Sequence, residues 1–336
     1  MKNGTGGLGP VDRERRRRLS GRRRALAAAA GALALLAACS AGGGEPGDPL
    51  AGPGDGPPAT TEELDGYGPP MLLGHIADPA VVESSGVVAS RRSPGRYWTH
   101  NDSDDGPIIY CLDEQAASCG TWTVAGAGAF DWEDIAAGPG PEPGTPYLYV
   151  GDIGDNLAVR PSIVVYRVPE PMPGPAVGTT ARADAITLRY PDGPRDAEAL
   201  LVHPTSGDLY VVAKEPSPGV YVARAPLAAG AAVTMARLAT LPVGGLGVLG
   251  SVTGGDISPD GARVALCTYV EGLELVLPPD ATSFDEIWAQ PPRRVALGPR
   301  PQGEGIAYRL DGRALVTTSE RRLGGAAPMH QVERRG

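Results

Sequence analysis

The stretch of sequence that decides the fold spans residues 196–214 and reads DAEALLVHPTSGDLYVVAK. An acidic start leads into the apolar run 199–202. The turn residues Pro204 to Gly207 follow, and then the β-branched and aromatic run 209–213. Apolar runs of this length, separated by a turn with Pro early and Gly late, predict two antiparallel strands joined by a tight connection.

The same pattern recurs with a period of roughly 50 residues. First strands are expected at 83–88, 131–136, 196–201, 254–258 and 302–307, and second strands at 97–99, 148–150, 209–212, 264–266 and 314–317. Third strands are expected at 108–110, 163–166 and 219–222, and fourth strands at 121–124, 185–188 and 294–297. Four short strands in each repeated unit are typical of propeller blades, so the sequence predicts an all-β propeller of five four-stranded blades.

The two ends of the repeat predict how the ring closes. The last unit ends near Val332 with only three strands, and residues 71–76 form a lone apolar segment before the first unit. We therefore expect the N-terminal strand to complete the last blade and leave no open sheet edge. A six-bladed ring is the main alternative, if the Gly-rich segment 243–252 hides strands, and a two-sheet sandwich is the other.

The N-terminus carries an export signal. Basic residues at 15–18 and 22–24 precede an apolar run of 14 residues, 25–38, which is too short to span a bilayer as a helix. The run ends in Leu36-Ala37-Ala38-Cys39, which resembles the lipobox of bacterial lipoproteins. The resemblance implies cleavage before Cys39, acylation of its thiol, and a lipid anchor at the extracellular face of the cell membrane. An ordinary secretory signal is the alternative, and the general and twin-arginine export routes both stay open.

Three segments follow from this interpretation: a signal peptide (1–38), a tether rich in Gly and Pro (39–70), and the propeller domain (71–333). Residues 1–38 hold nine basic and two acidic side chains, so their removal leaves 21 basic against 37 acidic residues, a net charge of −16. A domain this acidic repels nucleic acid and anionic lipid head groups, and we expect neither as a partner of the domain surface.

The remaining cysteines have different expected roles. Cys111 and Cys119 flank a short polar turn between two strand-like runs, so a disulfide is expected in an exported protein. Cys267 lies in the apolar run 264–267 and is expected to be a buried small residue.

The repeat also predicts where acidic side chains gather. First strands begin, and second strands end, on one face of the disc. Glu133, Glu198 and Glu304 share one register, which Ser85 and Gly255 occupy in the other two units. Two residues earlier stand Glu83, Asp131, Asp196 and Gln302, on the same side of each strand. One mouth of the central channel should therefore collect many carboxylates and few cations.

Converging carboxylates favour a hard cation, since oxygen donors with few His or Cys residues suit Ca²⁺. The candidate metal ligands are Glu83, Asp131, Glu133, Asp152, Asp196, Glu198 and Glu304. The alternative is that these acids cap turns and bind backbone amides. His100 is the candidate general base, and Lys214, the only lysine after residue 38, is the candidate group for holding an anion.

Short motifs resemble known propeller families. Residues 196–200 and 302–307, together with 209–214, look like the start of blades in secreted propellers related to phytase-like esterases. The turn Ser258-Pro259-Asp260-Gly261 is similar to turns of WD-repeat and TolB-type propellers. The phytase resemblance implies calcium-bridged phosphate held by several basic residues, of which this sequence offers Lys214. A looser match to gluconolactonase-like propellers implies one divalent ion held by Glu133, Asn101 and Asp152.

Two functions are consistent with these observations. The first is a surface-anchored propeller that binds a divalent cation and a small ligand or protein partner at its acidic mouth. The second is a calcium-dependent hydrolase of phosphoesters or lactones that uses metal-activated water. We favour binding, because the sequence contains no recognisable pair of nucleophile and base.

Overall fold

The computed structural model describes residues 66–335, apart from 103–104, 175–176, 244–246 and 322–324. These residues belong to one compact unit, Glu62–Gly336. The described regular structure is almost entirely β, with two short 3₁₀ helices, η1 (Gly247–Gly250) and η2 (Phe284–Ala289). The all-β prediction is confirmed. The predicted signal peptide, Cys39 and the tether up to residue 65 lie outside the described residues.

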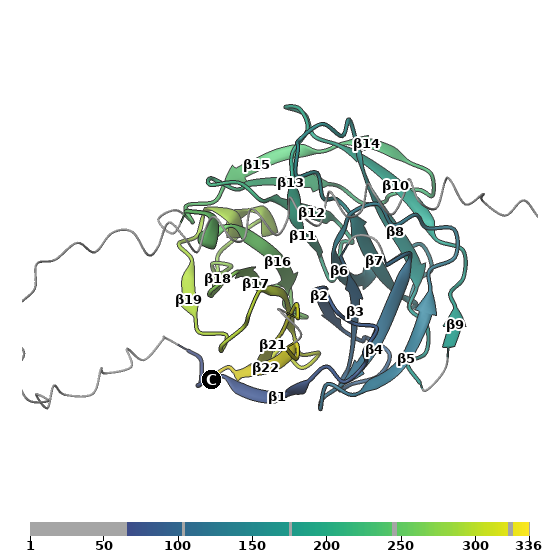
Figure 1. Cartoon of the computed structure of the whole chain (residues 1–336). Helices are drawn as coiled ribbons and strands as arrows, with labels where there is room; N and C mark the ends of the chain where they lie inside the picture. Colours follow the sequence, from purple (N-terminus) through teal and green to yellow (C-terminus); the bar gives the residue numbers. More distant parts are fainter. Residues whose placement is uncertain (1–65, 103–104, 175–176, 244–246, 322–324, 336) are drawn as a thin grey trace, which may run out of the picture. The chain divides into compact units, whose positions relative to one another are not determined.

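Five sheets surround a common axis as propeller blades, and neighbouring strands pair antiparallel within each four-stranded blade (Figure 1). Blade 1 contains β2 (Ser84–Ala89), β3 (Arg96–Asn101), β4 (Ile108–Asp113) and β5 (Ser118–Thr123). Blade 2 contains β6 (Trp132–Pro139), β7 (Pro146–Asp152), β8 (Ile163–Pro169) and β10 (Asp184–Arg189). Blade 3 contains β11 (Ala197–Val202), β12 (Leu209–Ala213), β13 (Gly219–Ala223) and β15 (Ala236–Thr240). Blade 4 contains β16 (Val252–Ile257), β17 (Arg263–Thr268), β18 (Gly272–Val276) and β19 (Arg293–Val295).

Blade 5 closes the ring as expected. It contains β20 (Gly303–Tyr308), β21 (Ala314–Ser319), β22 (Pro328–Glu333) and the N-terminal strand β1 (Met71–His75). The strand β1 pairs with β22, from Met71 opposite Gln331 to His75 opposite Pro328. Five blades are therefore confirmed over six, and the described part of the Gly-rich segment before β16 holds only η1.

Two outer strands were not predicted. The strand β9 (Val177–Thr179) pairs in parallel with β5, and β14 (Ala232–Thr234) pairs in parallel with β10. Each lies in a connection of one blade and extends the sheet of the preceding blade (Figure 1). Both consist of three residues at the outer edge, too short to produce an apolar pattern.

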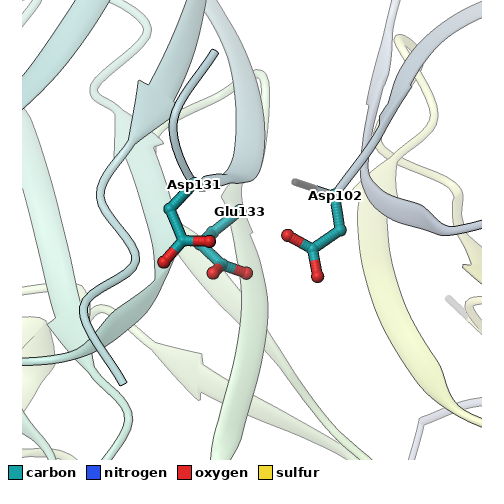
Figure 2. A group of neighbouring side chains, drawn as sticks. All are labelled: Asp102, Asp131 and Glu133. Carbon is teal, nitrogen blue, oxygen red and sulfur yellow. The ribbon is translucent and has the colours of Figure 1, made fainter. Parts of the chain in front are cut away.

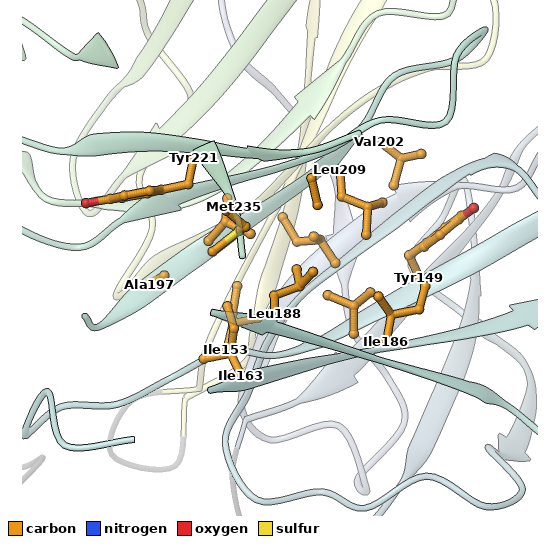
Figure 3. Packing of buried hydrophobic residues seen from close by; sticks show 14 of the residues in the cluster. Tyr149, Ile153, Ile163, Ile186, Leu188, Ala197, Val202, Leu209, Tyr221 and Met235 are labelled. Carbon is orange, nitrogen blue, oxygen red and sulfur yellow. The ribbon is translucent and has the colours of Figure 1, made fainter. Parts of the chain in front are cut away.

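The core is divided among the blade interfaces. Each of five apolar clusters lies between two neighbouring blades, and Figure 3 shows the cluster between blades 2 and 3. Leu200 faces blade 2 and Leu201 faces blade 4, because side chains alternate along a strand. Both faces of a blade are thus buried, which explains the nearly continuous apolar runs in the sequence.

The folded unit begins earlier than the predicted boundary at residue 71. Tyr67 is buried, forms a β-bridge with Arg334, and donates a hydrogen bond from its hydroxyl group to Glu274 Oε1 at 2.6 Å. Within the described residues, no helix is long and apolar enough to cross a membrane.

The cysteines after Cys39 lie where the sequence suggested. Cys111 and Cys119 form a disulfide between β4 and β5, with their Cα atoms 4.9 Å apart. Cys267 is a buried free thiol.

Candidate functional site

The first strands of the blades carry the candidate site. β2, β6, β11, β16 and β20 pack side by side around the axis. In every one of them the pairing register with the second strand shifts near the start of the strand. Glu133 and Glu198 are the extra residues of two such bulges. A bulge re-aims the side chain that it carries, and these bulges occur at the register of the predicted carboxylates.

Three carboxylates converge between blades 1 and 2. Asp131 precedes β6 and Glu133 lies within it, whereas Asp102 directly follows β3 (Figure 2). One carboxylate oxygen of each residue lies within 4.8 Å of the others. Glu133 is buried, and the two aspartates are partly exposed. The three oxygens are close enough for one ion to contact all of them after small movements.

Gly154 makes room for two of these carboxylates. A β-carbon at residue 154 would overlap Glu133 Oε1 and lie 2.7 Å from Asp131 Oδ2. The backbone N–H of Gly154 donates to the carbonyl oxygen of Asp131, and Arg160 Nη1 donates to the Gly154 carbonyl oxygen at 2.6 Å. The loop after β7 therefore forms one wall of the site, and a glycine at its contact point leaves the carboxylates of Glu133 and Asp131 in place.

A buried ion pair lies beside this group. Lys214, which follows β12, bonds through Nζ to Glu198 Oε1, and its ammonium group lies 5.4 Å from the centre of the Tyr269 ring. The second oxygen of Glu198, Oε2, is buried without a hydrogen-bond partner. An unpartnered buried carboxylate oxygen is costly, so Glu198 Oε2 has an unused capacity to accept a ligand.

Two further carboxylates complete the group. Glu304 lies on β20 and accepts a hydrogen bond from Gln302 Nε2 at 2.9 Å, and Glu320 directly follows β21. Both interact electrostatically with Asp102. We call the set of Asp102, Asp131, Glu133, Glu198, Lys214, Glu304 and Glu320 the acidic mouth. Glu198 interacts electrostatically with both Glu133 and Glu304, so the three glutamates of the shared register lie near one another.

Burial shifts the pKa values of the acidic mouth. Burial, followed by the Asp102 carboxylate, raises the pKa of Asp131 to about 7. Burial also raises the pKa of Glu198 to about 8 against the lowering effect of Lys214. The pKa of Glu133 is well above its usual range, first through burial and then through Asp102 and Glu198. A bound dication would relieve this repulsion and favour the ionised carboxylates.

The ammonium group of Lys214 stays charged. Burial lowers the pKa of Lys214, but the charges of Glu198, Tyr269 and Glu133 outweigh burial and hold that pKa well above its usual value. Lys214 therefore neutralises only one of the surrounding carboxylates.

Three of the predicted ligands have other interactions. Asp152 forms an ion pair with Arg160 at 2.8 Å and accepts from the Phe130 backbone N–H. Asp196 Oδ1 accepts from the Asp155 backbone N–H at 2.8 Å. Glu83 pairs through its backbone with Glu320 in an isolated β-bridge. Asp152 and Asp196 thus accept backbone N–H groups of nearby loops, as expected if these acids have a structural role instead of binding a cation.

His100 is enclosed. It is fully buried, its Nδ1 contacts the Asn101 carbonyl oxygen at 2.8 Å, and its ring lies edge-on to Trp132. Burial lowers the pKa of His100 to about 4, so the ring is neutral at physiological pH. Asn101 accepts the backbone N–H groups of Val82 and Glu83 and bonds Asp105, which commits it to the loop before β2.

Two acidic residues near the axis escaped the sequence analysis. Asp134 and Asp256 are buried and accept backbone N–H groups from first strands of other blades, Leu200 and Gly255 for Asp134 and Tyr308 for Asp256. The signal was present, since both residues stand one position after the register that Glu133 and Gly255 share. Asp102 and Glu320, which directly follow the second strands β3 and β21, were not among the predicted ligands.

Comparisons with known proteins assign no family to this chain. No family model matches the chain, and no curated protein matches its sequence. Hydrazine synthase of Kuenenia stuttgartiensis is 12% identical, with a TM-score of 0.39 over 70% of this chain and 68% of that chain. The U3-55K structure is 10% identical, with a TM-score of 0.35 over 74% and 67%. A chain of the nidogen/laminin complex is 15% identical, with a TM-score of 0.40 over 72% and 73%. Similarity at this level carries no argument about function.

Proposed function

We propose that the acidic mouth binds a divalent cation, Ca²⁺ by its donor chemistry, and with it a small ligand or a protein partner. The observation that carries the proposal is the convergence of Asp102, Asp131 and Glu133, with one oxygen of each within 4.8 Å of the others. Carboxylate oxygens from separate loops are the donors that Ca²⁺ prefers, and its flexible coordination suits a site completed by water.

Two features support a cation rather than turn capping at these positions. Gly154 leaves the space that the carboxylates of Asp131 and Glu133 occupy. Glu198 Oε2 is buried without a partner. In the turn-capping carboxylate of Asp152, by contrast, each oxygen accepts a hydrogen bond, one from the Phe130 backbone N–H and one from Arg160.

Binding is favoured over hydrolysis. A metal-dependent hydrolase needs a group that can accept a proton from the attacking water. Of the two residues that the sequence singled out for chemistry, His100 is enclosed beside Trp132, and Lys214 is ion-paired with Glu198 and positively charged. Asp131, whose pKa is raised to about 7, is itself a ligand of the proposed cation. We therefore put forward binding alone.

The experiment compares the melting temperature of the chain from Ser40 onward in EDTA and in calcium. At about 100 times its Kd, calcium stabilises by about 2.7 kcal/mol, which corresponds to a rise of about 5 °C or more for a domain of this size. Glu133→Gln is expected to lose most of the rise. Glu142→Gln, an exposed glutamate at the other end of β6, is the matched control and keeps it. No calcium shift in the parent chain, or equal shifts in both variants, would refute the proposal.

We also propose that the chain is exported and anchored to the outer face of the membrane through acylated Cys39. The sequence Leu36-Ala37-Ala38-Cys39 motivates this, and the Cys111–Cys119 disulfide suits an oxidising compartment. Wild-type chain should appear in the membrane fraction with a mass that includes acyl chains. If Cys39→Ala leaves both the fractionation and the mass of the processed chain unchanged, the anchor is wrong.

A further inference from the structure

Exposed apolar side chains gather on the face of the propeller that carries the acidic mouth. Ten large apolar side chains of the described residues are exposed, and six of them lie in connections on this face. These six form what we call the apolar rim: Val82, Phe130, Leu157, Val159, Leu249 and Val270. The other four lie on β1, on β9 and directly after β8.

The blade topology places the rim. Connections from a second to a third strand, and from a fourth strand to the next blade, all lie on the face where first strands begin. Leu157 and Val159 belong to the β7–β8 connection, and Val270 to the β17–β18 connection. Val82, Phe130 and Leu249 precede the first strands β2, β6 and β16. Five separate connections thus present exposed apolar side chains on the face that carries the acidic mouth, and a concentration of such side chains on one face is typical of an interaction surface.

The most exposed part of the rim is held firmly in place. Leu157 and Val159 are 79% and 67% exposed, although the loop that carries them is tightly hydrogen-bonded. The backbone N–H groups of Ala158 and Arg160 donate to Asp155 O and Oδ2, each at 2.6 Å. Ala158 lies between the two apolar residues with φ +49°, a left-handed conformation that costs a non-glycine residue about 1 kcal/mol or more. The loop therefore holds both side chains toward solvent instead of burying them.

The centre of the rim holds more carboxyl groups than cations. The acidic mouth has six carboxyl groups and one cation of its own, Lys214, and Arg160 lies close enough to act on Asp131. A positive charge that enters the mouth favours the ionised carboxylates, and six ionised carboxylates exceed the charge of Lys214 and one dication together. A surface of this kind is complementary to a partner that presents a basic side chain surrounded by apolar ones. Anionic lipid head groups are repelled by the same charge, which favours a protein over a membrane.

We propose that the apolar rim and the acidic mouth together form a docking surface for a protein segment that presents a basic side chain among apolar ones. The basic side chain enters the negative centre, and the apolar side chains cover Leu157, Val159 and their neighbours. The inference rests on the rim and on the excess of carboxyl groups over cations in the mouth. It does not require a bound cation, because a docked basic side chain also favours the ionised carboxylates.

The test uses fluorescein-labelled peptides and the chain from Ser40 onward, with binding measured by anisotropy. A peptide of alternating Lys and Leu is compared with a Lys/Ser peptide of equal charge and with a Glu/Leu peptide. The Lys/Leu peptide is expected to bind tightest and to weaken with added salt, and the Glu/Leu peptide not to bind. The double variant Leu157→Ser/Val159→Ser should bind the Lys/Leu peptide about tenfold more weakly, because the burial of two apolar side chains is lost. Its affinity for the Lys/Leu peptide should then equal that of the parent chain for the Lys/Ser peptide.

Matched controls separate the outcomes. Val177→Ser removes an apolar side chain that is 91% exposed on β9, at the outer edge of blade 1, and should leave peptide binding unchanged. Equal losses in the Val177 and rim variants, or Lys/Ser binding as tight as Lys/Leu, would overturn the proposal. The proposal would also be overturned if the chain bound phosphatidylcholine/phosphatidylglycerol vesicles and the rim substitutions abolished that binding. The apolar rim would then be a membrane-binding surface. Every titration is run in EDTA and in calcium, so failure of cation binding and failure of this docking surface are separate results.

Discussion

Asp134 of blade 2 accepts a backbone hydrogen bond from Gly255 of blade 4, with 3.2 Å between Oδ2 and N. These blades are not neighbours in the ring, so the bond crosses the axis. The same oxygen accepts the Leu200 N–H of blade 3 at 3.0 Å. On the blade 1 side, a β-carbon at Gly86 would lie 2.6 Å from Asp134 Oδ1. Asp134 on β6 thus contacts the first strands of three other blades, and the glycine at position 86 allows β2 to approach its carboxyl group.

Replacing Asp134 with alanine should therefore destabilise the whole ring. The change leaves the Leu200 and Gly255 N–H groups buried without acceptors, at about 1–3 kcal/mol each, so the free energy of unfolding should fall by about 3 kcal/mol or more. Urea denaturation measures it. The exposed Asp280→Ala is the matched control and should cost little. A loss for Asp134→Ala no larger than that of the control would contradict the structural role.

The blades were predictable from sequence because both faces of each blade are buried. Residues such as Leu200 and Leu201 then give nearly continuous apolar runs, and Gly and Pro turns separate them. The strand β1 was predictable because the repeat left one blade short. The strand β9 was not predictable, since Val177 is 91% exposed and the strand forms only by pairing with β5 of the neighbouring blade.

The candidate site was predictable only where the repeat fixes it. Glu133, Glu198 and Glu304 share a register, and ring symmetry alone brings equivalent positions to one axis. Asp152 looked equally suited to bind a cation. Its ion pair with Arg160 becomes apparent only from the fold of the loop after β7. The role of Asp134 also escaped, because the N–H groups that donate to it, those of Leu200 and Gly255, lie far away in the sequence.

Gly154→Ala should weaken calcium binding more than it weakens the fold. The added β-carbon would overlap Glu133 Oε1 and press on Asp131, and these side-chain ends can move away at small cost. Their displacement removes oxygens from the convergent group, so calcium affinity should fall about tenfold, equivalent to about 1.4 kcal/mol. Isothermal titration calorimetry measures it. At Gly174 a β-carbon meets nothing within 4 Å, so Gly174→Ala is the control. Unchanged affinity in Gly154→Ala would mean that Glu133 and Asp131 do not bind the ion.

Tyr67→Phe should lower the free energy of unfolding by about 1–3 kcal/mol, the range for a hydrogen bond to a charged group. The Tyr67 hydroxyl donates to Glu274, which also accepts from Tyr308 at 2.9 Å and pairs with Arg263. This contact attaches the segment before β1 to blade 4. Tyr190→Phe is the matched control, because the Tyr190 hydroxyl group is buried without a partner and its removal should be neutral or stabilising. Equal effects of the two substitutions would show that the Tyr67 contact contributes nothing.

Stability without metal should fall as the pH rises from 5 to 8, and Asp256 should carry part of that loss. Burial raises the pKa of Asp256 to about 7 against the lowering effect of the Tyr308 backbone N–H. In the unfolded chain an aspartate has a pKa near 3.9, so between about pH 4 and pH 7 the folded state binds more protons than the unfolded state. Its stabilising contribution is complete below pH 4 and is lost as the pH rises through 7. Urea denaturation in EDTA at pH 5 and pH 8 measures the difference. The difference should shrink in Asp256→Asn, which has no proton to lose there, and persist in Asp280→Asn. If Asp256→Asn keeps the full difference, the carboxyl group of Asp256 is ionised throughout this range, and its hydrogen bonds to Tyr308 and Ile257 outweigh its burial.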